Sequence, residues 1–250
     1  MRSLKKLVAV LALAAAPALA TAPAASASPY GPVAPGVSSG STIQVVGGEK
    51  APATPWAVQL LFKQNGSTYG CTGEQVNARW VLTARHCVDG ISSMNVYHSN
   101  STTNRGTATT ADRWGYAPSG DVALVHLSKA VNLSSYPALN LSYSPTTSGT
   151  GTIMGYGLRA NATPSTGLYQ ATVTRNGRSY DAYGGTAQHV NGVTGASNHG
   201  DSGGPLIVGG AIVGVCSTGD TADPGSNIAA GSNYAVLSPN ANWIRTTISQ

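Results

Sequence analysis

A short stretch of the sequence combines a serine, an acid and several glycines. Residues 199–206, "HGDSGGPL", place Asp201 directly beside Ser202 and surround both with glycine. A serine hydroxyl is a weak nucleophile until a neighbouring base takes its proton, and glycine allows the tight turn that presents such a side chain. The stretch therefore predicts a nucleophilic serine, and the next question is which histidine would serve it.

The order of the residues excludes one common arrangement. Residues 200–204 fit the G-x-S-x-G pattern of the nucleophile turn in α/β-hydrolases. In that fold the general-base histidine follows the serine, whereas no histidine follows Ser202 here. The base must come from the histidines that precede the serine, which are His86, His98, His126, His189 and His199.

Four of these histidines have a simpler interpretation. His199 is only three residues from Ser202, which favours a place at the rim of a pocket. His126 alternates with apolar residues in "DVALVHL", which predicts a packed strand face. His98 and His189 stand in polar stretches with no cue to a partner.

His86 differs from the others because the sequence around it predicts a fixed backbone. It follows the apolar strand pattern "RWVLTA" and stands next to Cys87. A disulfide from Cys87 to Cys71 would pin the loop and contribute about 3 kcal/mol. Since a general base must be held within about 3 Å of the proton it takes, His86 is the predicted base.

The three cysteines allow one disulfide and leave one thiol. The predicted bridge joins Cys71 to Cys87, and Cys216 lies in the apolar run "AIVGVC", which is typical of a small buried side chain. Two cysteines and a histidine are conceivable zinc ligands, but the paired spacing of such sites is missing. We expect no metal site and no cofactor.

Together the motifs resemble a known family. "LTARHC", "DVALVHL" and "GDSGGPL" are similar, in this order, to the histidine, aspartate and serine motifs of the chymotrypsin/trypsin (S1-type) family of serine proteases. The stretch 45–60, "VVGGEKAPATPWAVQL", resembles the mature N-terminus of that family, and "GYG" at 155–157 and "CSTG" at 216–219 match further segments. The resemblance spans residues 45–250, and short loops favour a secreted bacterial type.

The resemblance implies a catalytic role for each motif. Ser202 would be the nucleophile, His86 the general base and acid, and Asp121 the carboxylate that orients the imidazole and stabilises its charged form. The backbone N–H groups of Gly200 and Ser202 would form the oxyanion hole, where one donor is often worth about 3 kcal/mol.

Asp201 receives a different role from the resemblance. In the family the acid beside the serine pairs with the ammonium group of a newly cut N-terminus, and that ion pair shapes the oxyanion hole. The matching residue here is Val45. The resemblance therefore implies that the chain is made as an inactive zymogen, activated by cleavage before Val45.

The specificity pocket matches the family less closely. Ala196 stands where trypsins carry an aspartate, so a preference for Arg or Lys loses its usual basis. We expect an apolar or aromatic residue before the scissile bond, although Asp220 or Asp223 could still supply a charge from their loop. The expected substrate-binding residues are Ala196, Ser217, Thr218, Gly219 and Ser232.

The rest of the chain must position these groups, and its pattern favours β structure. Charged residues make up 9% of the chain, and short apolar runs alternate with turn residues without helical runs between them. This pattern agrees with the fold that the resemblance implies, an all-β protein of two six-stranded antiparallel β-barrels packed together with a short C-terminal helix. Ser238 can cap that helix and Pro239 suits its first turn.

The N-terminus has the pattern of a secretory signal. A basic start, an apolar middle at 7–16 and small-residue cleavage sites predict a signal peptide over 1–27, cut after Ala20 or Ala27. The apolar run is shorter than the roughly 20 residues of a membrane span. The basic start of this signal holds three of the five net positive charges of the chain. No basic tract in the sequence supports nucleic-acid binding.

These observations give a domain plan. We expect a signal peptide over 1–27, a propeptide over 28–44 and a peptidase domain over 45–250. Within the last, one barrel is expected over about 45–140, a second over about 150–237 and the helix over about 239–248.

The sequence thus predicts a secreted, extracellular serine endopeptidase that is a monomer and acts on proteins or peptides. It binds no nucleic acid and, once the signal is removed, no membrane. One alternative is a catalytically silent binding protein on the same fold, although such proteins typically lack a triad member and none is missing here. The other is an esterase that uses the same triad.

Overall fold

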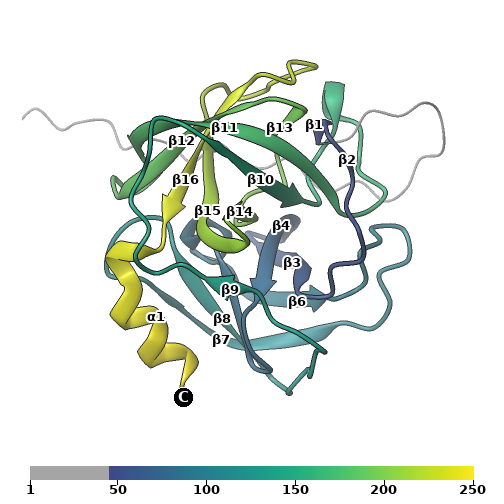
Figure 1. Ribbon diagram of the computed structural model, residues 1–250. Coiled ribbons are helices and arrows are strands. Elements are labelled where there is room, and N and C mark those ends of the chain that lie inside the picture. Colours follow the sequence, from purple (N-terminus) through teal and green to yellow (C-terminus); the bar gives the residue numbers. More distant parts are fainter. Residues whose placement is uncertain (1–44) are drawn as a thin grey trace, which may run out of the picture.

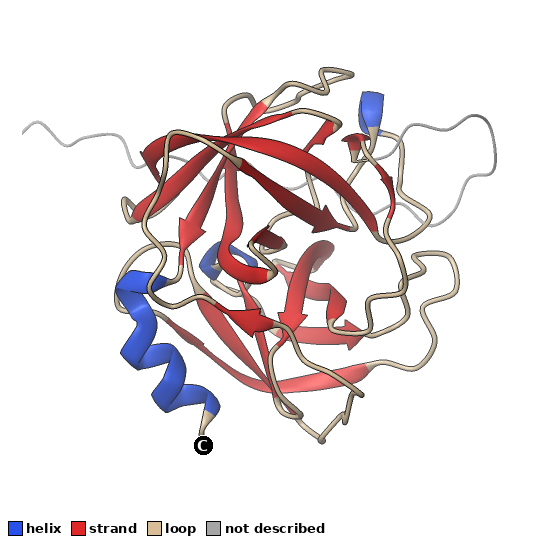
Figure 2. Ribbon diagram, in the orientation of Figure 1, coloured by secondary structure: helices blue, strands red, loops and turns tan. Residues whose placement is uncertain are grey.

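The computed structural model describes residues 45–250. The predicted signal and propeptide lie outside the described residues. Strands dominate residues 45–250. Figures 1 and 2 show two groups of strands, with the α-helix near the C-terminus at the edge of the molecule.

The first barrel is closed and entirely antiparallel, with the strand order β3-β4-β5-β8-β7-β6 and β6 pairing back to β3. Alternation explains its core: Val58, Leu60 and Phe62 on β3 are fully or almost fully buried. A two-residue turn at Asn65 and Gly66, both with positive φ, joins β3 to β4, as expected for an Asn-Gly hairpin. The strands are β3 (Ala57–Gln64), β4 (Ser67–Gln75), β5 (Trp80–Thr83), β6 (Ser93–Tyr97), β7 (Thr109–Tyr116) and β8 (Ala123–Leu127).

The second barrel has the strand order β10-β14-β15-β16-β12-β11, and the β10–β11 pairing closes it. The prediction of two six-stranded antiparallel barrels is therefore confirmed. Its strands are β10 (Thr150–Gly155), β11 (Tyr169–Tyr180), β12 (Thr186–Gly192), β14 (Pro205–Val208), β15 (Ala211–Gly219) and β16 (Gly231–Val236).

Four short strands attach to this framework. β2 (Glu49–Lys50) pairs with β11, and β9 (Ala138–Leu139) runs parallel to β15. β1 (Val46–Gly47) and β13 (Gly195–Ala196) form a separate antiparallel pair. This last pair places the start of the described chain beside the segment that leads to Ser202.

The C-terminal segment returns from the second barrel to the first. A 3-10 turn (Ser238–Asn240) leads into α1 (Ala241–Ile248), in agreement with the expected helix. Ile244 is fully buried in the core cluster of the first barrel. The expectation that Ser238 caps the helix is wrong, because its hydroxyl donates to the carbonyl of Tyr143, 2.6 Å away.

The two barrels also share apolar surface. The larger core cluster combines the first barrel with residues of β15, β16 and the C-terminal segment, among them Ile212, Val215 and Leu237. Val45 is 2% exposed and belongs to the core cluster of the second barrel. The catalytic candidates lie on segments where these barrels meet.

Candidate active site

His86 lies in a 3-10 turn (Arg85–Cys87) that follows β5. All four residues of β5 are buried, and so is Ala84, so the approach to the turn is rigid. The predicted disulfide is confirmed: Cys87 is bonded to Cys71 on the neighbouring strand β4. The backbone of His86 is thus anchored on both sides.

Asp121 faces His86 through two hydrogen bonds. The Nδ1 atom of His86 lies 2.6 Å from Oδ2 of Asp121, and the backbone N–H of His86 donates to Oδ1 over 2.9 Å. Because a carboxylate only accepts, the proton of the neutral imidazole is placed on Nδ1. The lone pair of the ring is then on Nε2, the atom that a general base would use.

The environment keeps Asp121 ionised although it is fully buried. Burial raises the pKa of its carboxyl, but the charge of His86 and the hydrogen bonds from His86 and Ser217 outweigh burial and hold the pKa below its usual value. Asp121 is therefore a carboxylate at neutral pH.

Ser217 supplies a contact that the sequence reasoning missed. It was predicted as a substrate-binding residue, whereas its hydroxyl donates to Oδ2 of Asp121 over 2.6 Å. Ser217 lies on β15 of the second barrel, so both barrels contribute to the surroundings of the acid. In the sequence, the match of "CSTG" to a family segment was the only indication that Ser217 lies near the active site.

The turn that carries Ser202 packs against the first barrel. The carbonyl of Ser202 accepts from the backbone N–H of Thr72 over 2.9 Å, and the hydroxyl of Thr72 donates to the carbonyl of Gly200. A Cβ on Gly203 would lie 2.1 Å from the hydroxyl of Thr83 and 2.9 Å from the backbone nitrogen of Ala84. Glycine thus lets the serine turn contact the strand that leads to His86.

The backbone at Gly200 has the special conformation that the glycine-rich motif suggested. Its φ is +95°, and a Cβ there would lie 2.9 Å from Cα of Gly157. Ser202 itself is 6% exposed. These two residues are the predicted donors of the oxyanion hole.

The carboxylate of Asp201 is bound by two backbone groups that lie outside the candidate triad. It accepts from the backbone N–H groups of Gly157 and Asn198, each over 2.8 Å. Asp201 is 2% exposed, and burial, opposed by these two bonds, raises the pKa of its carboxyl to about 7. No cationic side chain within residues 45–250 forms an ion pair with it.

The "GYG" segment owes its glycines to this carboxylate. A Cβ on Gly155 would lie 2.0 Å from Oδ1 of Asp201, and one on Gly157 would lie 2.6 Å from the same atom. The sequence matched this segment to the family without giving it a task. The structure shows that it leaves room for a buried acid.

The predicted pocket residues lie on the strands around the serine turn. Ala196 on β13 is 1% exposed and pairs with Val46. It lies two residues before Asn198, whose backbone N–H binds Asp201. Gly219 at the end of β15 pairs with Ser232 on β16, and Thr218 precedes it. These residues therefore come from three strands, β13, β15 and β16.

The two loop acids are engaged with their own neighbours. Asp220 lies 2.8 Å from Nε2 of His189, and Asp223 accepts from the backbone N–H of Gly225 over 2.8 Å. His199 lies 2.6 Å from the carbonyl of Ala222, so its ring is bound to the same loop. These contacts favour structural roles for both acids.

The remaining histidines also have partners. His126 is 6% exposed on β8, lies 2.6 Å from Asp112 and contacts Trp80, in line with a packed strand face. His98 lies 2.5 Å from Oε1 of Gln75, and burial lowers the pKa of its ring.

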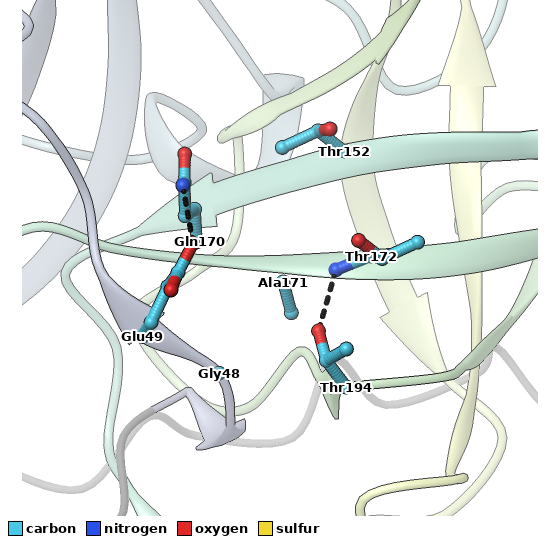
Figure 3. A pocket seen from close by; sticks show the side chains of 7 residues that line it. All are labelled: Gly48, Glu49, Thr152, Gln170, Ala171, Thr172 and Thr194. Atoms are coloured by element: carbon cyan, nitrogen blue, oxygen red, sulfur yellow. Dashed lines mark hydrogen bonds between the residues drawn. The ribbon is translucent and has the colours of Figure 1, made fainter.

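Other sites do not compete with this arrangement. Cys71, His86 and Cys87 lie close enough to hold a metal ion, but the disulfide occupies both sulfur atoms. A pocket on the second barrel contains none of the predicted catalytic side chains. Figure 3 shows its wall, where Gln170 donates to Glu49.

Within the described part of the chain, no helix is long and apolar enough to cross a membrane.

Comparisons with known proteins agree with this geometry. The family described as Trypsin matches residues 45–244. Trypsin alpha-4 of Lucilia cuprina is 30% identical over 198 residues, which cover 70% of this chain and 77% of the relative. Trypsin alpha of Drosophila erecta is 28% identical over 199 residues, with the same coverage of both chains.

Proposed function

Because the chain belongs to the trypsin family of serine proteases, we propose that it is a serine endopeptidase that works through Ser202, His86 and Asp121. The single observation that carries this proposal is the buried, ionised Asp121 that fixes the proton of His86 on Nδ1. Such a pair holds Nε2 ready to accept a proton from a serine hydroxyl.

The reaction then follows in two halves. Nε2 of His86 takes the proton of Ser202 as Oγ attacks the carbonyl carbon of the scissile peptide bond. The tetrahedral intermediate breaks its C–N bond, and the departing amine receives that proton from His86. Water repeats the sequence on the acyl-enzyme, releasing the new carboxyl end and restoring Ser202. Asp121 stabilises the imidazolium in both halves.

The oxyanion of each tetrahedral intermediate would be held by the backbone N–H groups of Gly200 and Ser202. The positive φ of Gly200 supports this role, since it sets the direction of the peptide group in the serine turn. Donors fixed by the fold need no reorganisation as charge develops, and this is their main advantage over water.

Cleavage before Val45 would activate the enzyme. Two observations support this: Val45 is buried in the second barrel, and Asp201 is a buried acid without a cation within residues 45–250. A new α-ammonium group at Val45 would supply that cation and hold the serine turn through Asp201. A signal peptide over 1–27 would direct export of the chain. Residues 28–44 would then be a propeptide that is removed after export.

The proposed substrates are proteins or peptides with an apolar or aromatic residue before the scissile bond. The apolar Ala196 in the predicted pocket and the engagement of Asp220 and Asp223 elsewhere support this preference. The proposal describes an extracellular monomer. Esters are expected to be cleaved by the same acyl-transfer chemistry.

Replacement of the nucleophile tests the proposal. Ser202→Ala should abolish labelling by a fluorophosphonate probe and lower the rate of peptide hydrolysis by about 10⁴-fold or more. His86→Ala should lose about as much, and the double variant should lose little more, because the two residues act as a unit. Ser128→Ala, on an exposed serine, is the matched control and should keep both labelling and rate.

Two results would contradict the proposal. Labelling or near-normal turnover in Ser202→Ala would show that another residue is the nucleophile. A chain that begins at Val45 but neither reacts with the probe nor hydrolyses peptides would favour a silent binding protein on this fold.

A further inference from the structure

The turn at residues 181–185 joins β11 to β12 of the second barrel and reaches the catalytic acid in the first. Asp181, 8% exposed, accepts the backbone N–H of Asp121 on Oδ2 over 3.0 Å. Its other oxygen, Oδ1, accepts the backbone N–H groups of Tyr183 and Gly185, each over 2.9 Å. One carboxylate thus ties its own turn to the backbone of Asp121.

Two glycines show how closely the parts fit. A Cβ on Gly120 would lie 2.3 Å from Oδ2 of Asp181, and one on Gly185 would lie 2.4 Å from that atom and 2.5 Å from Cα of Gly120. The φ of Gly120, +73°, also favours glycine. The residue before Asp121 and the turn therefore interlock by close backbone approach.

The same turn also directs the hydroxyl of Ser217. The backbone N–H of Ala182 donates to Oγ of Ser217 over 3.0 Å. A hydroxyl has one proton to give, and with Oγ accepting from Ala182 that proton is directed at Oδ2 of Asp121, 2.6 Å away. The turn thereby contacts Asp121 in two ways: directly at its backbone N–H, and through Ser217 at its carboxylate.

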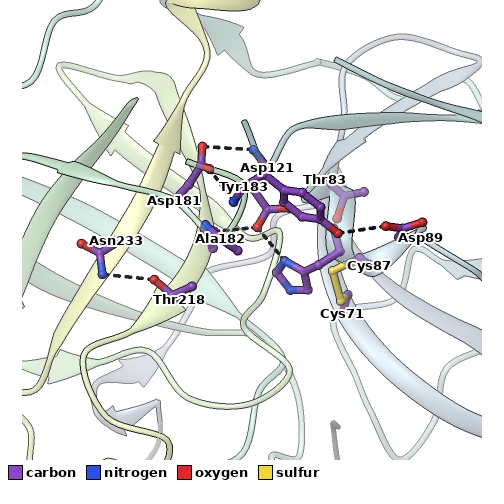
Figure 4. A network of polar contacts seen from close by, with 12 residues as sticks. Cys71, Thr83, Cys87, Asp89, Asp121, Asp181, Ala182, Tyr183, Thr218 and Asn233 are labelled. Carbon is purple, nitrogen blue, oxygen red and sulfur yellow. Dashed lines mark hydrogen bonds and ion pairs between the residues drawn. A yellow bond between two sulfur atoms is a disulfide. The ribbon is translucent and has the colours of Figure 1, made fainter. Parts of the chain in front are cut away.

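A third contact reaches the residue before His86. The guanidinium of Arg85 lies 4.2 Å from the ring centre of Tyr183 and 5.0 Å from that of Tyr116. The Tyr183 hydroxyl donates to Asp89 over 3.0 Å, next to the Cys71–Cys87 bridge (Figure 4). Burial and Asp89 raise the pKa of that hydroxyl, so it remains a donor at neutral pH.

We infer that the turn at residues 181–185 positions the Asp121–His86 pair across the boundary between the barrels, with Asp181 as its central positioning residue. This inference rests on the proposed function. Asp181 does not touch the substrate. It acts by fixing where the carboxylate of Asp121 lies relative to Nδ1 of His86, and a displacement of a fraction of an ångström there weakens proton transfer.

Asp181→Asn is the sharpest test, because an amide keeps one acceptor for the turn but turns an NH₂ group toward the N–H of Asp121. In the activated enzyme, kcat should fall about tenfold while KM changes less than about twofold. The acidic limb of the pH–rate profile should move to lower pH, because a displaced Asp121 and the lost charge stabilise the imidazolium of His86 less. The ¹H NMR signal of Nδ1–H of His86 should shift or broaden.

Asp112→Asn is the matched control. It removes one exposed carboxylate that pairs with His126, outside the catalytic network, and should leave kcat, the acidic limb and the Nδ1–H signal unchanged. Asp181→Ala should have a larger effect than Asp181→Asn because it loses all three backbone bonds. If the alanine variant does not fold, the asparagine variant still decides.

Unchanged kcat, acidic limb and NMR signal in Asp181→Asn would overturn the inference. So would a fall in melting temperature with these three quantities unchanged, since that is the result of a purely structural turn. An activated wild-type chain without hydrolysis or labelling would contradict the proposed function instead, and the Nδ1–H signals of wild type and Asp181→Asn would still decide the positioning role.

Discussion

Two buried aspartates, Asp121 beside His86 and Asp201 in the serine turn, differ in what surrounds them. Asp121 is 0% exposed and Asp201 is 2% exposed, so both have lost water. The pKa of Asp121 is nevertheless held below its usual value, because the charge and hydrogen bonds of His86 and the hydroxyl of Ser217 outweigh burial. The pKa of Asp201 is raised to about 7, since burial is opposed only by two backbone N–H groups.

The difference shows that burial alone does not decide the state of an acid. The interactions of Asp121 with His86 and Ser217 keep it ionised, and they do not depend on the state of the N-terminus. Asp201 has the donors but no cation within residues 45–250. An ammonium group at Val45 would supply this cation. We therefore propose that the surroundings of Asp201, and not those of Asp121, change on activation.

The largest expected effects come from replacing each aspartate by its amide. Asp121→Asn should lower kcat by about 10⁴-fold, because the amide favours the wrong tautomer of His86. Asp201→Asn should leave a folded chain whose activity is lower by about 10²-fold or more. An amide cannot hold the ammonium of Val45, so the donors of the oxyanion hole lose their support. Rates on a peptide substrate, after N-terminal sequencing has verified the start at Val45, measure both.

The proposed switch at Asp201 also predicts a change in how stability depends on pH. In the uncleaved chain, Asp201 has a raised pKa, so its contribution to stability is present below its ordinary value of 3.8 and is lost as pH rises through about 7. After the proposed cleavage, pairing with Asp201 would raise the pKa of the Val45 ammonium group. Its contribution to stability would then be present below the ordinary α-amino value of about 7.8 and lost as pH rises through the raised one. Full activity in Asp201→Asn, or in a chain that retains residues 28–44, would contradict this switch.

A third buried acid sharpens the comparison, since no other residue within 45–250 pairs with it as a cation or donates to it. Glu74 on β4 is fully buried, and neither of its side-chain oxygens has a hydrogen-bond partner within the described residues. Burial raises the pKa of its carboxyl well above the ordinary value, opposed only by the backbone N–H of Glu74 itself. Glu74 is therefore expected to be protonated in the folded protein at pH values where it ionises in the unfolded chain.

Glu74→Gln should accordingly change stability in a pH-dependent way. Wild-type stability from this residue is present below the unfolded pKa and falls as pH rises toward the folded one, whereas the amide does not titrate. We expect the two proteins to have similar free energies of unfolding near pH 4 and the variant to be more stable by roughly 1–3 kcal/mol at pH 8. Urea denaturation at both values measures this, and a variant that is less stable at pH 8 would show that Glu74 has a partner when charged.

The sequence predicted the fold and the candidate catalytic residues because both depend on local patterns. Short apolar runs between turn residues, and each of the three motifs that carry the family resemblance, are contained within a few residues. The contacts of Asp181 and Ser217 with Asp121 join residues that lie 60 and 96 positions apart, and no local pattern encodes them. The same holds for Ser238, whose capping pattern is local but whose hydroxyl is bound by Tyr143 from a distant loop.

The two cysteine environments give the smallest predicted effect and compare the barrels once more. The first barrel has the Cys71–Cys87 disulfide, whereas the second has the single thiol of Cys216, 5% exposed. Burial raises the pKa of that thiol to about 12, and since the thiolate is the reactive form, the native protein should resist alkylation by iodoacetamide. After unfolding in urea without a reductant, Cys216 alone should be modified, as measured by peptide mass mapping. Cys216→Ala should remove the signal and, because the thiol takes no part in the proposed chemistry, change kcat by less than about twofold. Modification of Cys71 or Cys87 without a reductant would contradict the disulfide, and rapid alkylation of the native protein would show that the core of the second barrel opens near the serine turn.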